Sequence, residues 1–322
     1  MASLRQLLES RSRHLTIGSD GTLTVDGDFL SPGFLAPLAA HVKAAGYARG
    51  AVSFASPDVR GYISAIRFAG AVWGADDFAF DRRNAGVRYS PLVHLATPAD
   101  TGTAASTIND CIRTILADAP PRYVDLLRHV VSEVHENVGA HAEACGFSCA
   151  QAHAQGDDQV FEFSIADCGK GFLRECQRIG LGVRDDREAI EWCIQRGHST
   201  KAVRPVDEFA QYVPEDAPNV PIPGPVRRTP ATSNNHAGLG LDLLLRLVRQ
   251  FGGSLTLASG ASFLAVSSRG RETYHRSPFP WPGVALTIQF RIATVLQRVA
   301  AVPEDPLLEE IYRRLQGIRV PE

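Results

Sequence analysis

The sequence predicts a protein of the α/β (α+β) class with two domains. Its 322 residues are roughly twice the size of a usual domain. Apolar residues make up 44% of the chain, enough for sizeable cores. Strand and helix patterns alternate in residues 1–118, which is typical of a layered α/β domain. A second series of patterns occupies residues 119–300, so we expect the domain boundary near Ala119-Pro120-Pro121.

The first domain is expected to begin with short strands and amphipathic helices. Ser31-Pro32-Gly33 supplies an N-cap and a first-turn proline for a helix that ends near Gly46. Pro57-Asp58 opens a second helix, which carries apolar residues as far as Phe68. The expected strands span 23–25, 51–55 and 92–95, and a connecting helix spans 101–118.

The second domain is expected to begin with a long helix over residues 122–142, because its apolar residues recur every three or four positions. An antiparallel hairpin follows, with its turn at 155–158. The remaining expected elements are the hairpin strands 147–154 and 160–167, helices 186–196 and 240–251, strands 254–258, 263–267 and 284–292, and a C-terminal helical tail within 301–322. Residues 198–237 hold seven of the 20 prolines without helical or strand period, which indicates a functional or disordered loop.

Composition and charge exclude several classes of protein. The formal net charge is -2 and charged residues make up 21%, so the strongly basic balance of a nucleic-acid-coating protein is absent. No stretch approaches the roughly 18 apolar residues of a membrane span, and the N-terminal residues do not resemble a signal peptide. We therefore expect a cytoplasmic protein whose six cysteines are reduced thiols.

A metal site is the first alternative to consider for His141, Cys145, Cys149 and His153, which recur every fourth residue. On one helix the outer two would stand about 18 Å apart, too far to share an ion. Gly146 also interrupts the helix before Cys149. Buried structural thiols are therefore the favoured interpretation.

The first motif with chemical content lies in the long helix, where Glu133, Asn137 and His141 are four residues apart and share a face. A carboxylate and a carboxamide one turn apart suit a magnesium-phosphate site. The amide oxygen can ligate the cation, and the carboxylate can orient or deprotonate an attacking hydroxyl. Taken alone, the spacing fits an exposed polar stripe better.

The second motif, Asp167-Cys168-Gly169-Lys170-Gly171, follows directly on an apolar strand. Strand alternation places Asp167 at the end of a row of core residues, and a buried carboxylate needs a partner. The exocyclic amine of adenine would be one, and Gly169 and Gly171 would let the backbone approach a flat base. An ordinary glycine-rich turn after a strand is the simpler alternative.

The third motif, Gly238-Leu239-Gly240-Leu241, leads into a helix. Glycines at a helix N-terminus expose amides that bind phosphate, although they can also merely permit a tight junction. Rossmann and Walker motifs do not match, because no strand precedes a G-x-G-x-x-G and no Gly-Lys-Ser/Thr follows.

Together, in this order, the three motifs resemble those of the Bergerat-fold ATP-binding domain, the GHKL family that groups gyrase, a heat-shock chaperone, histidine kinases and MutL. The resemblance covers residues 120–293. It implies an α/β sandwich whose mixed sheet has helices on one face, binding ATP and Mg²⁺. Glu133 is then the implied catalytic base, Asn137 the magnesium ligand and Asp167 the adenine-recognising residue. The implied nucleotide-binding set is Asn137, His141, Asp167, Gly169, Gly171, Thr200, Lys201, Gly238, Leu239, Gly240 and Leu241.

The same resemblance implies a role for residues 198–237, which follow the helix expected at 186–196. Ser199-Thr200-Lys201 is similar to the sequence at which the nucleotide lid begins in kinase-type members, which makes Lys201 a phosphate contact. Residues 198–237 become the lid. Gly283 resembles the final-strand glycine near the adenine pocket.

The first domain resembles, more loosely, a STAS-like domain, the fold of anti-sigma-factor antagonists. Leu30-Ser31-Pro32-Gly33-Phe34 stands at the strand-to-helix turn of such domains, which sometimes carries a phosphorylatable serine. Ser31 is therefore a candidate phosphoacceptor, with a helix cap as the favoured alternative.

These features predict an ATP-binding regulatory protein that hydrolyses Mg-ATP or phosphorylates a protein serine as a switch. No histidine-bearing helical hairpin precedes the ATP-binding domain, which disfavours an autophosphorylating histidine kinase. Only about 30 residues follow Ile292, too few for the coupling domain of a strand-passage motor. The expected partners are ATP and a regulatory protein or protein substrate, without nucleic acid or membrane, and a homodimer is left open. The alternative is a nucleotide-responsive or nucleotide-free protein-interaction module without turnover.

Overall fold

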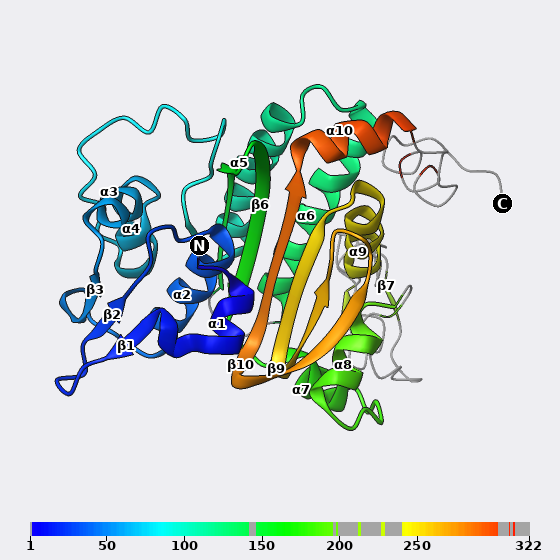
Figure 1. Ribbon diagram of the computed structural model, residues 1–322. Coiled ribbons are helices and arrows are strands. Elements are labelled where there is room, and N and C mark those ends of the chain that lie inside the picture. The colour runs from blue at the N-terminus through cyan, green and yellow to red at the C-terminus, as the bar shows by residue number, and fades with distance from the viewer. Residues whose placement is uncertain are drawn as a thin grey trace.

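The centre of the protein is a five-stranded sheet in which every neighbouring pair of strands is antiparallel (Figure 1). The computed structural model describes residues 2–141, 146–195, 198, 212–213, 227–228, 240–301, 309 and 312. Across the sheet the strands are β4 (Val93–Leu95), β5 (Gly146–Gln155), β6 (Asp158–Asp167), β10 (Glu272–Arg291) and β9 (Ser254–Val266).

The predicted α/β class is confirmed, but the larger sheet is not mixed in the part of the chain that the structure describes. Short connections account for two of the four pairs, β5–β6 and β9–β10, because a tight turn can join only antiparallel neighbours. The predicted hairpin is present, with Gly156 at φ +63° in the turn between β5 and β6. The strands β9 and β10 form a second, longer hairpin.

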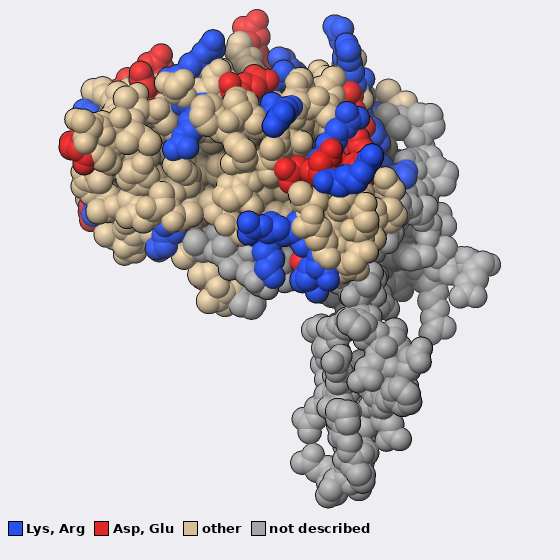
Figure 2. Space-filling model, turned by 90° about the horizontal axis from the view of Figure 1, so that it is seen from below, with Lys and Arg blue, Asp and Glu red and all other residues tan. Residues whose placement is uncertain are grey.

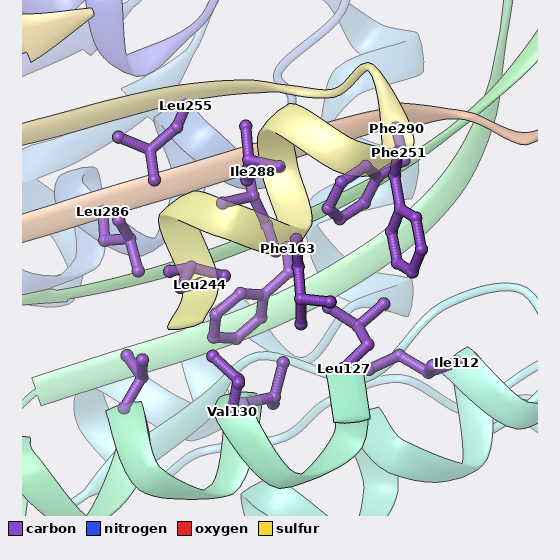
Figure 3. Close-up of a cluster of buried hydrophobic side chains, with 14 of the residues drawn as sticks. Ile112, Leu127, Val130, Phe163, Leu244, Phe251, Leu255, Leu286, Ile288 and Phe290 are labelled. Atoms are coloured by element: carbon purple, nitrogen blue, oxygen red, sulfur yellow. The ribbon is translucent and has the colours of Figure 1, made fainter. Parts of the chain in front are cut away.

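One face of the sheet is covered by helices α5 (Pro98–Ile115), α6 (Pro121–His141), α9 (Gly240–Phe251) and α10 (Ile292–Ala301). Figure 3 shows Leu127 and Val130 of α6 and Leu244 of α9 pointing toward Phe163 of β6. These side chains are fully buried, and burial of each stabilises the fold by about 1.5–3 kcal/mol. The apolar repeat of α6 therefore does what its spacing predicts.

The opposite face of the sheet is covered by the N-terminal segment, through α1 (Leu4–Ser10) and α2 (Pro32–Ala44). Helix α2 is buried on nearly all sides, as expected of a helix that lies between two layers. Its core includes Phe147 of β5 and Ala285 of β10, so one hydrophobic cluster joins both parts of the chain. We expected helices on only one face of this sheet. The opposite face is also covered by helices, and the even-numbered residues of β6 from 160 to 166 are buried there.

The outer layer of the N-terminal segment is a three-stranded sheet of β1 (Leu15–Ile17), β2 (Leu23–Val25) and β3 (Val52–Phe54). Strands β1 and β2 are antiparallel, and β2 and β3 are parallel. Helices α3 (Pro57–Ala65) and α4 (Phe68–Trp73) follow. A single helix was expected through Phe68, but Arg67 is left-handed at φ 67° and separates two helices.

A buried carboxylate attaches α2 to the larger sheet. Glu162 of β6 is 0% exposed, and its Oε1 accepts hydrogen bonds of 2.7 Å from Ser31 Oγ and from the Gly33 backbone nitrogen. Gln289 Nε2 donates to Oε2 at 2.9 Å. Burial raises the pKa of Glu162, and these donors act against that shift. The carboxylate lies at the N-terminus of α2, where the helix dipole favours negative charge.

The same contact corrects the expectation for Ser31. Ser31 precedes α2 as its N-cap residue, but its side chain makes no capping hydrogen bond and donates to Glu162 instead. It is 0% exposed, so in this conformation its hydroxyl is inaccessible to a phosphorylating enzyme. Gly33 cannot be larger, because a methyl group there would lie 2.7 Å from Glu162 Oε1.

The domain boundary that we expect near residue 119 stays a prediction. Two elements that precede residue 119 belong to the larger sheet and to the helical layer on it. Strand β4 pairs with β5, and α5 packs in the same core as α6. Residues before the expected boundary therefore cover both faces of the larger sheet, α1 and α2 on one face and α5 on the other.

Several elements have no counterpart in the sequence prediction. The strands expected at 254–258 and 263–267 are one strand, β9, and β10 begins twelve residues before 284. Helix α7 (Gly171–Arg178), the short α1 and α10 were not expected, whereas α8 (Asp186–Cys193) was. The remaining short elements are 3-10 turns at Arg11–Arg13 and Arg49–Ala51 and the pair β7 (Tyr212–Val213) and β8 (Arg227–Arg228).

Charged side chains of both signs lie together where α7 and α8 reach the surface (Figure 2). Ion pairs account for part of this arrangement, since Arg184, just before α8, pairs with Glu188, and Arg187 pairs with Glu191 within the helix. Among the described helices, none combines the length and the apolar composition that a membrane crossing requires.

The attachment of α2 predicts the effect of Ser31→Ala. The substitution removes one donor from a buried carboxylate, so the free energy of unfolding should fall by about 1.5–3 kcal/mol. Urea denaturation measures the change. Ser64→Ala is the matched control, because Ser64 is exposed and donates only to the Arg60 carbonyl; it should cost under about 0.5 kcal/mol. Equal stability of the two variants would contradict the attachment.

Candidate functional site

The first group of site residues forms where α9 begins against α6. Gly240 is the first residue of α9, and a methyl group there would lie 3.1 Å from Glu133 Oε2 and 3.9 Å from Asn137 Nδ2. The first and third motifs, far apart in the sequence, are therefore in contact. Any side chain at position 240 would press against the Glu133 carboxylate, which accounts for glycine at this junction.

Glu133 has a histidine one helical turn before it. His129 Nε2 lies 3.4 Å from Glu133 Oε1, and the Glu133 side chain is 11% exposed. The carboxylate is thus largely shielded, yet part of it still reaches solvent. A carboxylate held this way beside an imidazole can accept a proton from water or a hydroxyl.

The second group surrounds Asp167 at the C-terminal end of β6. Asp167 is 3% exposed, as the strand alternation predicts. Its Oδ1 accepts a hydrogen bond of 2.8 Å from the Gly169 nitrogen, and the Val284 backbone also donates to the carboxylate. Burial raises the pKa of Asp167 to about 6, and the two backbone donors limit that rise. Two donors do not exhaust a carboxylate, which offers about four acceptor positions.

The backbone near Asp167 is packed too closely for side chains at two glycines. A methyl group at Gly283 would overlap the Asp167 carboxylate and lie 2.6 Å from the Gly169 nitrogen. Gly171 has φ +69°, and a methyl group there would lie 2.8 Å from Ser259 Oγ. The Ser259 hydroxyl in turn accepts from the Phe172 nitrogen at 2.9 Å, which fixes the start of α7.

Both groups lie toward the same end of the sheet. Gly146, the first residue of β5, pairs with Asp167 at the last residue of β6. A methyl group at Gly146 would lie 2.7 Å from Val138 Cγ1, so the residue after Asn137 covers this end of the β5–β6 ladder. The chain of contacts therefore runs from Asn137 through Val138 and Gly146 to Asp167.

Of the remaining predicted site residues, one packs in the core and the others lie outside the described part of the chain. Leu241 is partly buried against the core of α6 and α9, which gives it a packing role. Thr200, Lys201, Gly238 and Leu239 lie outside the described residues, as do the side chain of His141 and the segments 199–211, 214–226 and 229–237 of the predicted lid.

Two residues near Asp167 were missed by the sequence reasoning. Trp281 donates its indole N–H to the Asp167 carbonyl at 2.8 Å, and Ser259 anchors α7. Trp281 stands in Pro280-Trp281-Pro282-Gly283, which interrupts the strand pattern and could have marked a specialised turn. Ser259 precedes Gly260, another irregular point in a strand.

The described residues contain no group of three or more side chains that could hold a metal ion by themselves. Cys149 and His153 lie on β5, and burial raises the Cys149 pKa and lowers that of His153. The buried-thiol interpretation of Cys149 agrees with this. Glu133 and Asn137 could contribute two oxygen ligands to a cation that takes the rest from phosphate and water.

Comparisons with known proteins found no family model, curated protein or solved structure that matches the chain.

The packing around Asp167 predicts a large effect of Gly283→Ala. The methyl group has no space, so the free energy of unfolding should fall by about 1–3 kcal/mol. Thermal denaturation followed by circular dichroism measures the loss. Gly61→Ala in α3 is the control, since no atom lies within 4 Å of its added methyl group and its stability should be unchanged or higher. A Gly283→Ala protein as stable as Gly61→Ala would refute this packing.

Proposed function

We propose that the protein is an adenine-nucleotide-binding regulatory ATPase or protein kinase of the Bergerat (GHKL) type, with a STAS-like N-terminal unit. The close approach of Gly240 to Glu133 carries the proposal, since it joins the first and third nucleotide motifs. The buried Asp167 at the same end of the sheet supports it further. Bound Mg-ATP would supply the transferable phosphoryl group and the cation that neutralises its charge.

In this proposal Asp167, Asn137 and Glu133 each have a separate role in nucleotide binding or catalysis. The Asp167 carboxylate accepts the exocyclic amine of adenine, since the donors at Gly169 and Val284 do not exhaust its acceptor positions. The Asn137 amide oxygen ligates the cation. Glu133 takes the proton from the attacking water or serine hydroxyl, with His129 one turn away holding the carboxylate in place.

The N-terminal unit gives this site a route to regulation. Glu162 lies five residues before Asp167 on β6, and Ser31, the residue before α2, and Gly33 of α2 bind it on the opposite face. A movement of α2 would therefore act on the strand that ends at the adenine-recognising residue. Such coupling suits a switch, with a partner protein or protein substrate at its output.

The role of Asp167 predicts opposite effects of Asp167→Asn on binding and on stability. The amide presents a donor where adenine also presents one, so ATP affinity should fall roughly tenfold to a hundredfold. The melting temperature at pH 7 should not fall, because a buried charge is removed. Calorimetric titration with Mg-ATP and a thermal melt measure both quantities.

The pH dependence of the unmodified protein provides the control for Asp167→Asn. Its ATP affinity should fall, by up to tenfold per pH unit, as the pH drops through about 6 and Asp167 is protonated. Asp167 should contribute the opposite trend to stability, because a pKa raised above the unfolded value near 3.9 makes folding less favourable as the pH rises from about 4 to about 6. Glu162, His41 and His135 add pH dependences of their own, so this contribution is measured as the difference between the unmodified protein and Asp167→Asn. Asp167→Asn should lack both the fall in affinity and this contribution to stability. A chain that binds no adenine nucleotide at any pH would leave the interaction module as its function.

The role of Glu133 predicts the result of Glu133→Gln. Phosphate release or phosphoryl transfer from ATP should fall roughly a hundredfold or more, with ATP affinity nearly unchanged. Glu136→Gln is the matched control, since Glu136 is exposed on the same helix. Radiolabelled ATP, with and without candidate protein substrates, measures turnover. Parent turnover in Glu133→Gln would exclude Glu133 as the base.

A further inference from the structure

Two cysteines meet where α7 packs against α8. Cys176 lies in α7 and Cys193 is the last residue of α8, and the two helices lie side by side at the lower edge of Figure 1. The two thiols are hydrogen-bonded to each other. Cys176 is fully buried, and Cys193 is partly exposed. The packing of two separate helices therefore brings a dithiol pair together beside the surface.

Both helices are also held to the β9–β10 hairpin. Helix α7 starts at Gly171, against Ser259 and the Gly283 carbonyl. At the other helix, the Ala261 nitrogen donates to Asp186 at 2.8 Å. The two sulfur atoms are thus carried by helices that share one anchor.

We propose that Cys176 and Cys193 form a redox modification site, which closes to an intramolecular disulfide when the protein meets a peroxide. One sulfur attacks hydrogen peroxide and becomes a sulfenic acid, with release of the first water. The second sulfur then attacks the sulfenic sulfur, and the second water leaves as the S–S bond forms. Two thiols are oxidised and one peroxide is reduced to two waters.

The acidity of Cys176 separates it from Cys111 and Cys149, whereas the hydrogen bond with Cys176 and burial raise the pKa of Cys193. The hydrogen bond from Cys193 lowers the pKa of Cys176, which favours the thiolate that reacts with peroxides. Burial raises the pKa of Cys111 in α5 to about 12 and also raises that of Cys149 in β5. Those two thiols are buried, which keeps them protonated.

The disulfide would bear on the candidate nucleotide site through α7. The segment from Asp167 to Gly171 leads directly into this helix, so an S–S bond would tie that segment to α8. The site is proposed on the dithiol alone and does not depend on nucleotide binding.

Peptide mapping of the full-length protein after hydrogen peroxide treatment tests the proposal. Trypsin places the two cysteines in separate peptides, residues 175–178 and 188–196, each with one cysteine. We expect intact mass spectrometry to show the loss of two hydrogens, and non-reducing digestion to yield these peptides joined. Dithiothreitol should restore both. Oxidation that leaves residues 175–178 and 188–196 unlinked, or that links them to other cysteines, would overturn the proposal.

Variants add an independent check. Cys176→Ser and Cys193→Ser should each abolish the loss of two hydrogens, whereas Cys111→Ser should retain it. The mapping of the unmodified protein stands even where a variant folds poorly. Because the readout is mass and not ATP turnover, failure here leaves the proposed nucleotide site untouched, and failure of nucleotide binding leaves the dithiol intact.

Discussion

The alternation of side chains along β6 is the constraint on which the rest of the structure depends. β6 lies in the middle of the five-stranded sheet, so both of its faces must be covered. Phe161, Phe163 and Ile165 enter the core beneath α6 and α9. Glu162 and Ser164 point to the other face, where α2 binds Glu162. A shift of one residue would exchange these two sets, bringing a carboxylate into the apolar core and phenylalanines against the polar end of α2.

The same alternation determines the character of Asp167. The residue continues the apolar row of β6 past its end, which buries a carboxylate beside backbone donors. Part of its hydrogen-bonding capacity is met inside the chain by Gly169 and Val284. A purely structural carboxylate would need no more than this. The raised pKa shows that burial outweighs these bonds, and a ligand amine would compensate for that burial.

The sequence was sufficient for elements whose patterns are local and strong. The three- and four-residue repeat of α6 and the two hairpin strands β5 and β6 were predicted nearly to their ends. The break at Arg67 was not, because a left-handed arginine has no sequence signature. Neither was the length of β10, whose Pro280-Trp281-Pro282-Gly283 stretch reads as a loop and is held in the sheet by its neighbours.

The candidate site was predictable as a set of motifs but not as a geometry. Spacing alone puts Glu133 and Asn137 on one helix face, and glycines suggest a helix start at Gly240. The contact between the start of α9 and the Glu133 face of α6 depends on how α9 packs on the sheet, which the sequence pattern does not show. The contact of Ser31 with Glu162 was equally inaccessible, since it joins residues on different layers and replaces an expected helix cap.

Hydrogen–deuterium exchange with and without Mg-ATP tests most directly whether α6, the end of β6 and the start of α9 form one nucleotide site. We expect slower exchange in peptides covering residues 130–140, 165–173 and 240–246, all with the same dependence on ATP concentration. Unchanged exchange in all three segments, or protection of one segment alone, would contradict a single nucleotide site.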